Sequence, residues 1–428
     1  MIREWDCCKS GGDVSSAGLG PHAQRIAERY ASGHLREADA RLSGMKTPPG
    51  TLALKIASPT QLLLERSGGA GYPIHPLWLR ERCRDAASMD LKTQQRWADP
   101  SDFDLELTIV SVTQPAADSL RVKFGDGHEA TFSAADILEE AALEPNSHDC
   151  PPPRLWNGTL APLPRVRWRA NAEDGERSSW LETFLSLGFV IFEGVPTEPG
   201  TVLKVGAAFG FVRETNFGAL FDVRSTPAAT DLAYTSVSLD PHTDNPYRTP
   251  VPGIQLLHCL ANETSGGLST LVDGFAVAQA LREADAEAFA VLAATPVRFK
   301  YIDGDTELTA SAPPIELDVT GAPKAIHFSP RLDFVPLLPF ARLQSYYRAR
   351  REFDRRLRAR DFELRFLLKA GDLVMFDNCR LLHGRTGFDP AEGLRHLQGC
   401  YIDIDGPRSQ YRVLRRRGAQ AAAVRRSA

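Results

Sequence analysis

The chain has 428 residues, 43% of them hydrophobic and 24% charged, with a formal net charge of −4 and a pI of about 6.2. This length is sufficient for two domains, and the charge balance argues against nucleic acid or a membrane surface as a partner. Because no run of 18 apolar residues occurs, we expect no transmembrane helix.

Seven cysteines are scattered along the chain, and none of them forms a C-x-x-C pair. This usage argues against a disulfide framework and favours a reducing compartment, so we expect a cytoplasmic protein. The first residues are charged and lack an apolar core segment, which predicts no secretory signal.

The N-terminal third divides into an extension and a small domain. Residues 1–50 are rich in glycine and serine and are expected to be a disordered extension. The sequence of residues 51–150 predicts a β-rich domain, with strands in 105–113 and 120–133 and a helix over 134–143. The second of these stretches contains a Gly-Asp-Gly turn. A proline-dense linker then runs to about residue 165.

Residues 165–428 form the larger predicted unit. A helix and a strand are expected in 178–196, and many short apolar runs separated by turns follow, which is typical of a sandwich or barrel. Two helices are expected to interrupt these strands, over 276–294 and 340–361. In the second helix, Leu343, Tyr347 and Phe353 are expected to lie near one face.

The stretch DPHTDNPY (240–247) carries the first candidate site residues. On a strand, His242 and Asp244 would share one face. With a second histidine they would form the two-histidine, one-carboxylate set that binds Fe(II) and leaves open positions for oxygen chemistry. About one such H-x-[DE] pair is expected by chance in this composition, so a surface or capping pair is the alternative.

Two later stretches carry the other candidates. MFDNCRLLHGRTGF (375–388) places His383 at a strand end, where it is either a ligand or a core histidine with satisfied hydrogen bonds. In LRHLQGCYIDID (394–405), Arg395 shares a strand face with Tyr401 and points into a β core. A buried arginine needs an anionic partner, so we expect either the carboxylate of a co-substrate or an internal Arg–Asp bridge.

The order of these motifs, H-x-D, a distal histidine and an arginine twelve residues later, resembles the Fe(II)/2-oxoglutarate dioxygenases. The wider sequence, over about residues 55–416, resembles the γ-butyrobetaine and trimethyllysine dioxygenase family of the TauD/TfdA superfamily. The motifs are HPLWLRERCRDAASMDLKTQQRW, AYTSVSLDPHTDNPY, PGIQLLHCL, GGLSTLVDGF, FDNCRLLHGRTGF and RHLQGCYIDID. The implied fold is mainly β with flanking helices, a double-stranded β-helix (jelly roll) preceded by a small β-rich domain.

The resemblance assigns roles by matched position. His242, Asp244 and His383 would be the catalytic residues and would ligate Fe(II). Arg395, with Ser269 as a second contact, would bind 2-oxoglutarate, and O2 would be the other co-substrate. The implied reaction is hydroxylation of an unactivated C–H bond of a small molecule, in carnitine biosynthesis if that molecule is γ-butyrobetaine. The carboxylate ligand favours hydroxylation over halogenation, and the resemblance also allows a homodimer.

The residues expected to contact the substrate do not identify it. Phe217, Phe221, Tyr234 and Tyr401 match an aromatic cage for a quaternary ammonium group, the alternative being ordinary core aromatics. The first two are phenylalanine where relatives tend to carry tyrosine and tryptophan, which predicts a weaker cation–π site or another ligand. Asp231 matches a neutral asparagine near the substrate's acidic end, and a carboxylate there would disfavour an anionic tail.

Relatives in this family often bind structural zinc through several cysteines after the W-L-R motif and a histidine. Here Cys83 stands alone, and because zinc needs about four ligands we predict no structural zinc. Two alternatives to the main function stay open. One is the same chemistry on a sulfonate, phosphonate or amino acid, and the other is a non-catalytic jelly-roll binding module.

Overall fold

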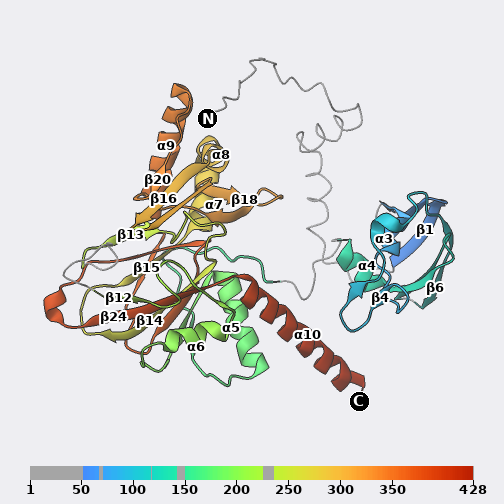
Figure 1. The fold of residues 1–428 in the computed structure, drawn as a ribbon, viewed down its shortest axis with the longest axis horizontal. Coiled ribbons are helices and arrows are strands. Elements are labelled where there is room, and N and C mark those ends of the chain that lie inside the picture. Colours follow the sequence, from blue (N-terminus) through green and yellow to red (C-terminus); the bar gives the residue numbers. More distant parts are fainter. Residues whose placement is uncertain (1–51, 67–70, 117, 142–149, 225–235, 428) are drawn as a thin grey trace, which may run out of the picture. The chain divides into compact units, whose positions relative to one another are not determined.

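The computed structural model describes residues 52–66, 71–116, 118–141, 150–224 and 236–427 (Figure 1). The expected extension, residues 1–50, lies outside this range, as do Asp231 and Tyr234. The chain divides into two compact units, residues 1–146 and 147–428. Within the described residues, no helix is both long enough and apolar enough to cross a membrane.

The N-terminal unit is built from two three-stranded antiparallel sheets, β1–β2–β3 and β6–β7–β8, and a short hairpin, β4–β5. The stretch 120–133 forms a hairpin, in which the expected Gly125–Asp126–Gly127 turn separates β7 from β8. Apolar side chains alternate inward along both strands and form one core. The elements are β1 Leu52–Ser58, β2 Gln61–Arg66, β3 Tyr72–Ile74, α3 Pro76–Arg80, β4 Met89–Asp90, β5 Gln95–Arg96, η1 Pro100–Asp102, β6 Ile109–Ala116, β7 Ser119–Phe124, β8 Glu129–Ser133 and α4 Ala134–Glu140.

The C-terminal unit contains the two sheets of a jelly roll, as expected from the sequence. The larger sheet has seven strands in the order β11–β24–β14–β22–β10–β9, with β12 also paired to β24, and the smaller sheet has the order β13–β23–β15–β21. The larger sheet contains β9 Arg165–Arg167, β10 Phe189–Glu193, β11 Val212–Arg213, β12 Phe221–Val223, β14 Ile254–Asn262, β22 Leu373–Asp377 and β24 Arg395–Ile402. The smaller sheet contains β13 Leu239–His242, β15 Ser269–Asp273, β21 Glu363–Phe366 and β23 Leu381–Arg385.

The larger sheet is covered on both faces, which explains its continuous apolar strands. In β10, Phe189 and Ile191 pack in a cluster with side chains of the smaller sheet, whereas Val190 and Phe192 pack on the opposite face. That outer face is covered by helices α5 Asp174–Leu187 and α6 Thr201–Ala207 and by the first part of α10 Asp405–Ser427, whose later residues extend away from the sheet (Figure 1).

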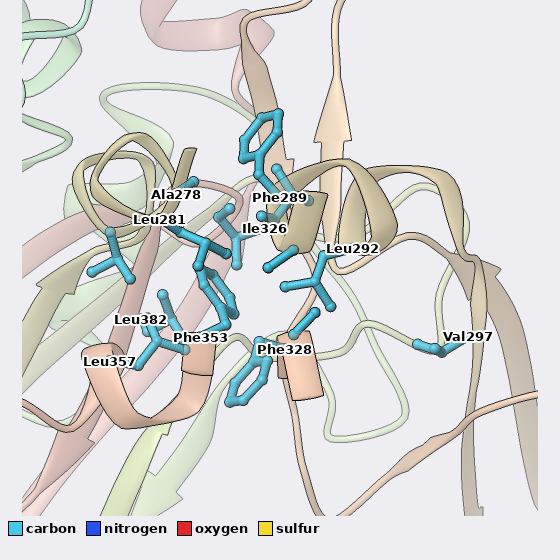
Figure 2. Close-up of a cluster of buried hydrophobic side chains, with 14 of the residues drawn as sticks. Ala278, Leu281, Phe289, Leu292, Val297, Ile326, Phe328, Phe353, Leu357 and Leu382 are labelled. Atoms are coloured by element: carbon cyan, nitrogen blue, oxygen red, sulfur yellow. The ribbon is translucent and has the colours of Figure 1, made fainter. Parts of the chain in front are cut away.

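A helical layer packs beside the smaller sheet around a third apolar cluster (Figure 2). Leu281, Phe353 and Leu382 meet there, from two helices and a strand. The segments are α7 Gly274–Ala284, α8 Ala286–Ala294, α9 Phe340–Leu357, the sheet β17–β16–β20 (Thr306–Ala312, Val297–Asp303, Asp333–Phe334) and the hairpin β18–β19 (Ile315–Leu317, Pro323–Ile326). A short 3-10 turn, η3, spans Pro390–Glu392.

Two details of this layer differ from the sequence-based expectation. The helix expected over 276–294 is two helices, because Asp285 leaves the helical conformation and its carboxylate caps the second by accepting from the Ala288 amide. In α9 the buried side is formed by Tyr346, Ala349 and Phe353, whereas Tyr347 is 51% exposed. The expectation that Leu343, Tyr347 and Phe353 lie near one face is therefore wrong.

One buried ion pair connects the linker, the smaller sheet and the helical layer. The Arg380 guanidinium donates to both carboxylate oxygens of Asp273, at 3.1 and 2.7 Å, and to the carbonyls of Ser186 and Arg154. Asp273 also accepts from the Trp156 amide and caps α7. Both side chains are almost wholly inaccessible, so each charge depends on the other.

We therefore expect Arg380→Met to destabilise the protein by about 3–5 kcal/mol, since it leaves a carboxylate buried without its cation. Arg355→Met is the matched control, because its pair with Glu352 is exposed and should contribute at most about 1 kcal/mol. Urea unfolding followed by circular dichroism measures both. Equal midpoints for the two variants would contradict the role given to this pair.

Candidate active site

The two candidate histidines lie opposite each other on neighbouring strands. His242 ends β13, His383 lies in β23, and the two are direct partners in the antiparallel register. Their ring centroids are 4.4 Å apart. Strand pairing therefore brings together two residues that are far apart in the sequence.

Asp244 is held beside them by its backbone. The side-chain amide of Asn378 donates to the Asp244 carbonyl at 2.9 Å, and its oxygen accepts from the Asp244 amide at 2.8 Å. Between the two candidate ligands, the Thr243 amide donates to the Phe328 carbonyl, and the Phe328 amide donates back to the Thr243 hydroxyl. The next residue, Asn245, has φ of 54°, a left-handed conformation that asparagine tolerates better than most residues. These contacts fix the carboxylate after the strand has ended.

The donor atoms of these three side chains fit a divalent metal. Ligand atoms of His242, Asp244 and His383 all lie within 4.8 Å of one another. Nδ1 of His242 lies 2.8 Å from the Asp240 carbonyl, which can only accept, so Nδ1 carries a proton and the lone pair of the neutral ring is on Nε2. That lone pair faces a carboxylate oxygen of Asp244 at 3.4 Å. Two electron-rich atoms in this arrangement are stabilised by a cation between them.

The protonation states of His383 and Asp244 agree with a metal site. Burial lowers the pKa of His383 to about 4, so this imidazole is neutral at pH 7 and can act as a ligand; the positive charge of Arg331 is one of the smaller contributions to this shift. Burial alone would raise the pKa of Asp244, but the neighbouring imidazoles and a hydrogen bond from Tyr401 hold it well below its ordinary value. The Tyr401 hydroxyl donates to Asp244 Oδ2 at 2.7 Å. One anionic and two neutral ligands match the facial set that Fe(II) prefers.

Arg395 begins β24 and is 6% exposed. Its Nη2 donates to the Gly267 carbonyl at 3.2 Å, and among the described residues Nε has no hydrogen-bond partner. Gly267 has φ of 62°, and a Cβ there would lie 2.7 Å from Nε, so this position keeps space for the guanidinium. No described carboxylate pairs with Arg395, so the internal Arg–Asp bridge is absent from the described part of the chain.

A second buried arginine adds to the positive charge of this region. Burial and the charge of Arg395 lower the pKa of Arg385 to about 10, and both side chains line one cavity with Ser269. Two guanidiniums in a poorly hydrated space favour an anionic ligand, and a carboxylate matches their planar donors. The donor set therefore fits a dicarboxylate co-substrate.

The cavity that contains the triad has a volume of about 390 Å³ and lies between the two sheets. Phe217, Phe221 and Tyr401 of the predicted cage line it, whereas Tyr234 lies outside the described residues. Phe221 packs against Tyr401, with ring centroids 5.2 Å apart and ring planes tilted by 31°. The Tyr401 hydroxyl is already bonded to Asp244, so this ring borders both the metal ligands and the aromatic wall.

The sequence interpretation missed two further aromatic residues in this wall and a cation beside it. Tyr301, from β16, lies edge-on to Phe217 at 5.7 Å and stacks on Tyr247 at 4.9 Å. Both tyrosines and Arg331 line the cavity. Tyr247 is the last residue of the DPHTDNPY motif, whereas β16 and the turn that contains Arg331 lie outside the motifs that sequence reasoning used.

A second group of possible metal ligands lies in the N-terminal unit and consists of Cys83, Asp85 and His128, hereafter the N-terminal cluster. Sequence reasoning considered the cysteine alone and missed its neighbours. His128 Nε2 lies 3.0 Å from Asp85 Oδ2 and 3.3 Å from the Ser88 hydroxyl, to which Arg80 donates at 3.2 Å. The Cys83 thiol points to the Leu79 carbonyl.

The N-terminal cluster does not fit a structural zinc ion well. It offers three ligands where such sites use four, and burial raises the pKa of the Cys83 thiol to about 11. A guanidinium also lies at its edge. We therefore expect a chelator to leave the unfolding temperature of the Asp244→Ala variant, in which the proposed Fe(II) site is disabled, unchanged in a thermal scan. A lower unfolding temperature, restored by added zinc, would contradict this prediction.

Comparison with known proteins gives matches over both units. Residues 160–401 match the model of the taurine catabolism dioxygenase TauD, TfdA family, and residues 56–138 match the N-terminal model named gamma-butyrobetaine hydroxylase-like. Gamma-butyrobetaine dioxygenase of Pseudomonas sp. (strain AK-1) is 36% identical over 81% of this chain and 92% of its own length. The Pongo abelii protein of the same name is 31% identical over the same shares. Mitochondrial trimethyllysine dioxygenase of Rattus norvegicus is 31% identical over 79% of this chain and 82% of its own.

Proposed function

We propose that this chain, which belongs to the taurine catabolism dioxygenase TauD, TfdA family and is an Fe(II)/2-oxoglutarate-dependent dioxygenase, hydroxylates a γ-butyrobetaine-like quaternary ammonium compound. One observation carries the proposal. The donor atoms of His242, Asp244 and His383 converge in a cavity whose lining also contains a row of aromatic rings. The names of the relatives, which act on γ-butyrobetaine or trimethyllysine, support a quaternary ammonium substrate.

Each candidate site residue has a role in this proposal. His242, Asp244 and His383 hold Fe(II), and Arg395 binds the distal carboxylate of 2-oxoglutarate with Ser269 beside it. Fe(II), 2-oxoglutarate and O2 together supply the oxidation of an unactivated C–H bond, with release of succinate and carbon dioxide. Tyr401 keeps its proton, because burial and Asp244 raise its pKa, and so holds one carboxylate oxygen in place.

The aromatic wall is the proposed contact for the quaternary ammonium group. Phe217, Phe221, Tyr247, Tyr301 and Tyr401 all line the cavity. A cation near such ring faces gains about 0.5–2 kcal/mol per contact, more where water is excluded. The wall contains no tryptophan among the described residues, which allows a ligand shape other than that of γ-butyrobetaine.

The remaining features of the proposal concern organisation and partners. We assign residues 51–150 to an N-terminal β-rich domain and 165–428 to the catalytic domain. The partner is a small molecule, and we propose a cytoplasmic protein that binds neither nucleic acid nor membrane and that can form a homodimer. The near-neutral charge and the scattered cysteines support these assignments.

Succinate formation across a substrate panel tests the proposal. The panel contains γ-butyrobetaine, trimethyllysine, a sulfonate, a phosphonate and free amino acids, each with Fe(II), 2-oxoglutarate and O2. We expect the largest stimulation over the substrate-free rate from a quaternary ammonium compound.

Stimulation by only a sulfonate, phosphonate or amino acid would replace the proposed substrate class and keep the reaction class. If no compound stimulates and the purified protein binds no Fe(II), the chain is a non-catalytic binding module.

A further inference from the structure

Asn245 directly follows Asp244 and is buried, with 4% of its surface exposed. Its φ angle of 54° is one that asparagine and glycine adopt more readily than other residues. Before it, the Asn378 side chain holds the amide and the carbonyl of Asp244. After it, the Arg248 amide donates to the Asn245 carbonyl at 3.1 Å. A backbone that is anchored on both sides fixes the direction of the Asn245 side chain.

The oxygen of this side chain is bonded to the aromatic wall. The Tyr247 hydroxyl donates to Asn245 Oδ1 at 2.6 Å, and the Tyr247 ring stacks on Tyr301 with centroids 4.9 Å apart. Tyr301 in turn lies edge-on to Phe217. All three rings line the cavity together with Asn245. A ligand that moves these rings therefore also moves the hydroxyl that is bonded to Asn245.

The nitrogen of the same side chain acts on Tyr401. Asn245 Nδ2 is buried and forms no regular hydrogen bond with a described residue. Burial and Asp244 raise the pKa of the Tyr401 hydroxyl, and the Asn245 side chain opposes this rise, as a hydrogen-bond donor does. The contact between Nδ2 and this hydroxyl is thus incompletely formed. Because a buried donor without a full hydrogen bond is unfavourable, a movement that completes the bond is stabilising.

Tyr401 connects this amide with the metal site. Its hydroxyl donates to Asp244 Oδ2 at 2.7 Å, and its ring packs against Phe221. The polar groups that lead from the wall to the carboxylate, hereafter the polar chain, belong to Tyr247, Asn245, Tyr401 and Asp244. Hydrogen bonds in such a chain polarise one another, so that strengthening one of them strengthens the next.

The polar chain joins the two functions assigned to this cavity. Tyr247, at one end, belongs to the wall that is the proposed contact for the quaternary ammonium group, and Asp244, at the other end, is a proposed ligand of Fe(II). A cation over a tyrosine ring draws electron density from the hydroxyl, which makes this hydroxyl a stronger donor. Contact with the rings also presses Asn245 and Tyr401 together. Both effects of a bound substrate strengthen the hydrogen bond to the carboxylate.

We propose that Asn245 is a positioning residue that transmits occupancy of the aromatic wall to Asp244. This inference rests on the proposed function and goes beyond it, because it assigns the substrate dependence of 2-oxoglutarate turnover to the polar chain. Without substrate, the contact between Asn245 and Tyr401 is incomplete, and one carboxylate oxygen is held less firmly. With substrate, the contact closes and the carboxylate is fixed.

Tyr247→Phe and Asn245→Gly test the polar chain at two points. The first variant keeps the ring and removes only the hydroxyl, and the second removes the amide while glycine adopts the same φ without strain. The control is Tyr346→Phe, which removes the hydroxyl of a buried tyrosine that does not line the cavity. The measured quantity is the stimulation of succinate formation by the best quaternary ammonium compound over the substrate-free rate.

We expect each of the two variants to lower this stimulation roughly three- to tenfold, the factor that corresponds to one net hydrogen bond. The double variant should lose no more than Asn245→Gly alone, because both changes interrupt the same chain. Fe(II) affinity, measured by calorimetry, should stay at the wild-type value in Tyr247→Phe, whose hydroxyl is bonded to Asn245 and not to a metal ligand. Tyr346→Phe should behave as wild type in every measurement.

A readout without turnover separates transmission from weaker substrate binding. Under anaerobic conditions, saturating substrate should shift the charge-transfer absorption of wild-type protein loaded with Fe(II) and 2-oxoglutarate, because the carboxylate ligand responds to the wall. The shift should be smaller in Tyr247→Phe and in Asn245→Gly at concentrations that also saturate each variant.

Four results would each overturn the inference: wild-type stimulation in Tyr247→Phe, an equal loss in Tyr346→Phe, additive losses in the double variant, or an absorption shift of wild-type size in both variants. Failure of the proposed function gives a different result, since wild-type protein is then stimulated by no quaternary ammonium compound. In that case the polar chain is tested with the panel compound that does stimulate. If no panel compound stimulates, the role of Asn245 is wrong together with the proposed function.

Discussion

Asp244→Ala is expected to abolish substrate-dependent succinate formation and to weaken Fe(II) binding severely. The carboxylate is the single anionic group of the proposed ligand set, and His242 and His383 alone leave Fe(II) with two neutral imidazoles. Loss of a residue that merely orients a metal ligand costs about 10–100-fold, so loss of the ligand itself should exceed a hundredfold. Turnover of 2-oxoglutarate and Fe(II) content after desalting measure the two effects.

Asp240→Ala is the matched control for this experiment. Asp240 lies on the same strand, two residues before His242, and its side chain pairs with Arg358 at the surface. Its backbone carbonyl, which accepts from His242, is retained in the variant. Circular dichroism should show that both variants are folded. Normal turnover by Asp244→Ala would mean that this carboxylate is not a ligand.

Arg395→Met is expected to raise KM for 2-oxoglutarate by at least about a hundredfold, with Fe(II) affinity preserved. The guanidinium can form two parallel charge-assisted hydrogen bonds with a carboxylate, each contributing about 1.5–3 kcal/mol. Because an unpaired buried cation costs stability, the variant should also be at least as stable as wild type without co-substrate. Steady-state kinetics and thermal unfolding test both parts of the prediction.

Arg365→Met is the control for Arg395, since Arg365 lies on the smaller sheet and pairs with Glu363 near the surface. It should leave KM for 2-oxoglutarate unchanged. If Arg395→Met also leaves this KM unchanged but loses stability, Arg395 serves packing and the co-substrate binds elsewhere in the cavity.

Sequence reasoning reached the triad because its members occur in short motifs in a fixed order. About one H-x-[DE] pair is expected by chance in this composition, so the pair alone did not indicate a metal site. The distal histidine and the arginine that follow it in order made an iron site the better interpretation. The geometry then depends on register, which pairs His242 with His383 across two strands. Asn378, whose side chain fixes Asp244, lies in the MFDNCRLLHGRTGF motif, but a hydrogen bond over this sequence separation cannot be inferred from composition or periodicity.

Fewer of the residues on the substrate side of the cavity could be predicted from the sequence. Tyr301 and Arg331 come from a strand and a turn whose approach to the site depends on how β16 packs beside the jelly roll. For a similar reason Asp85 and His128 were not connected with Cys83, because a β-hairpin turn brings them together. In both regions the residue types were visible, but the contacts arise from tertiary structure.

The two incorrect predictions about helices have causes in the local sequence. The alanine-rich segment 276–294 has high helical propensity throughout, which concealed the break at Asp285. In α9, the buried side follows Tyr346, Ala349 and Phe353, and a small alanine within that face made the exposed Tyr347 the more conspicuous choice. Where a helix breaks and which of its residues are buried depend on the surface against which it packs. Helix propensity and side-chain size alone did not predict either.

An anaerobic titration of 2-oxoglutarate into Fe(II)-loaded protein tests the central claim most directly, because chelation of Fe(II) by the keto acid gives a visible charge-transfer absorption. We predict saturable absorption in wild-type protein, with one Fe(II) bound per chain. Asp244→Ala should show none, and Arg395→Met should need a much higher concentration of 2-oxoglutarate. Absence of the absorption in folded wild-type protein, or its persistence unchanged in Asp244→Ala, would contradict the assignment of this cavity.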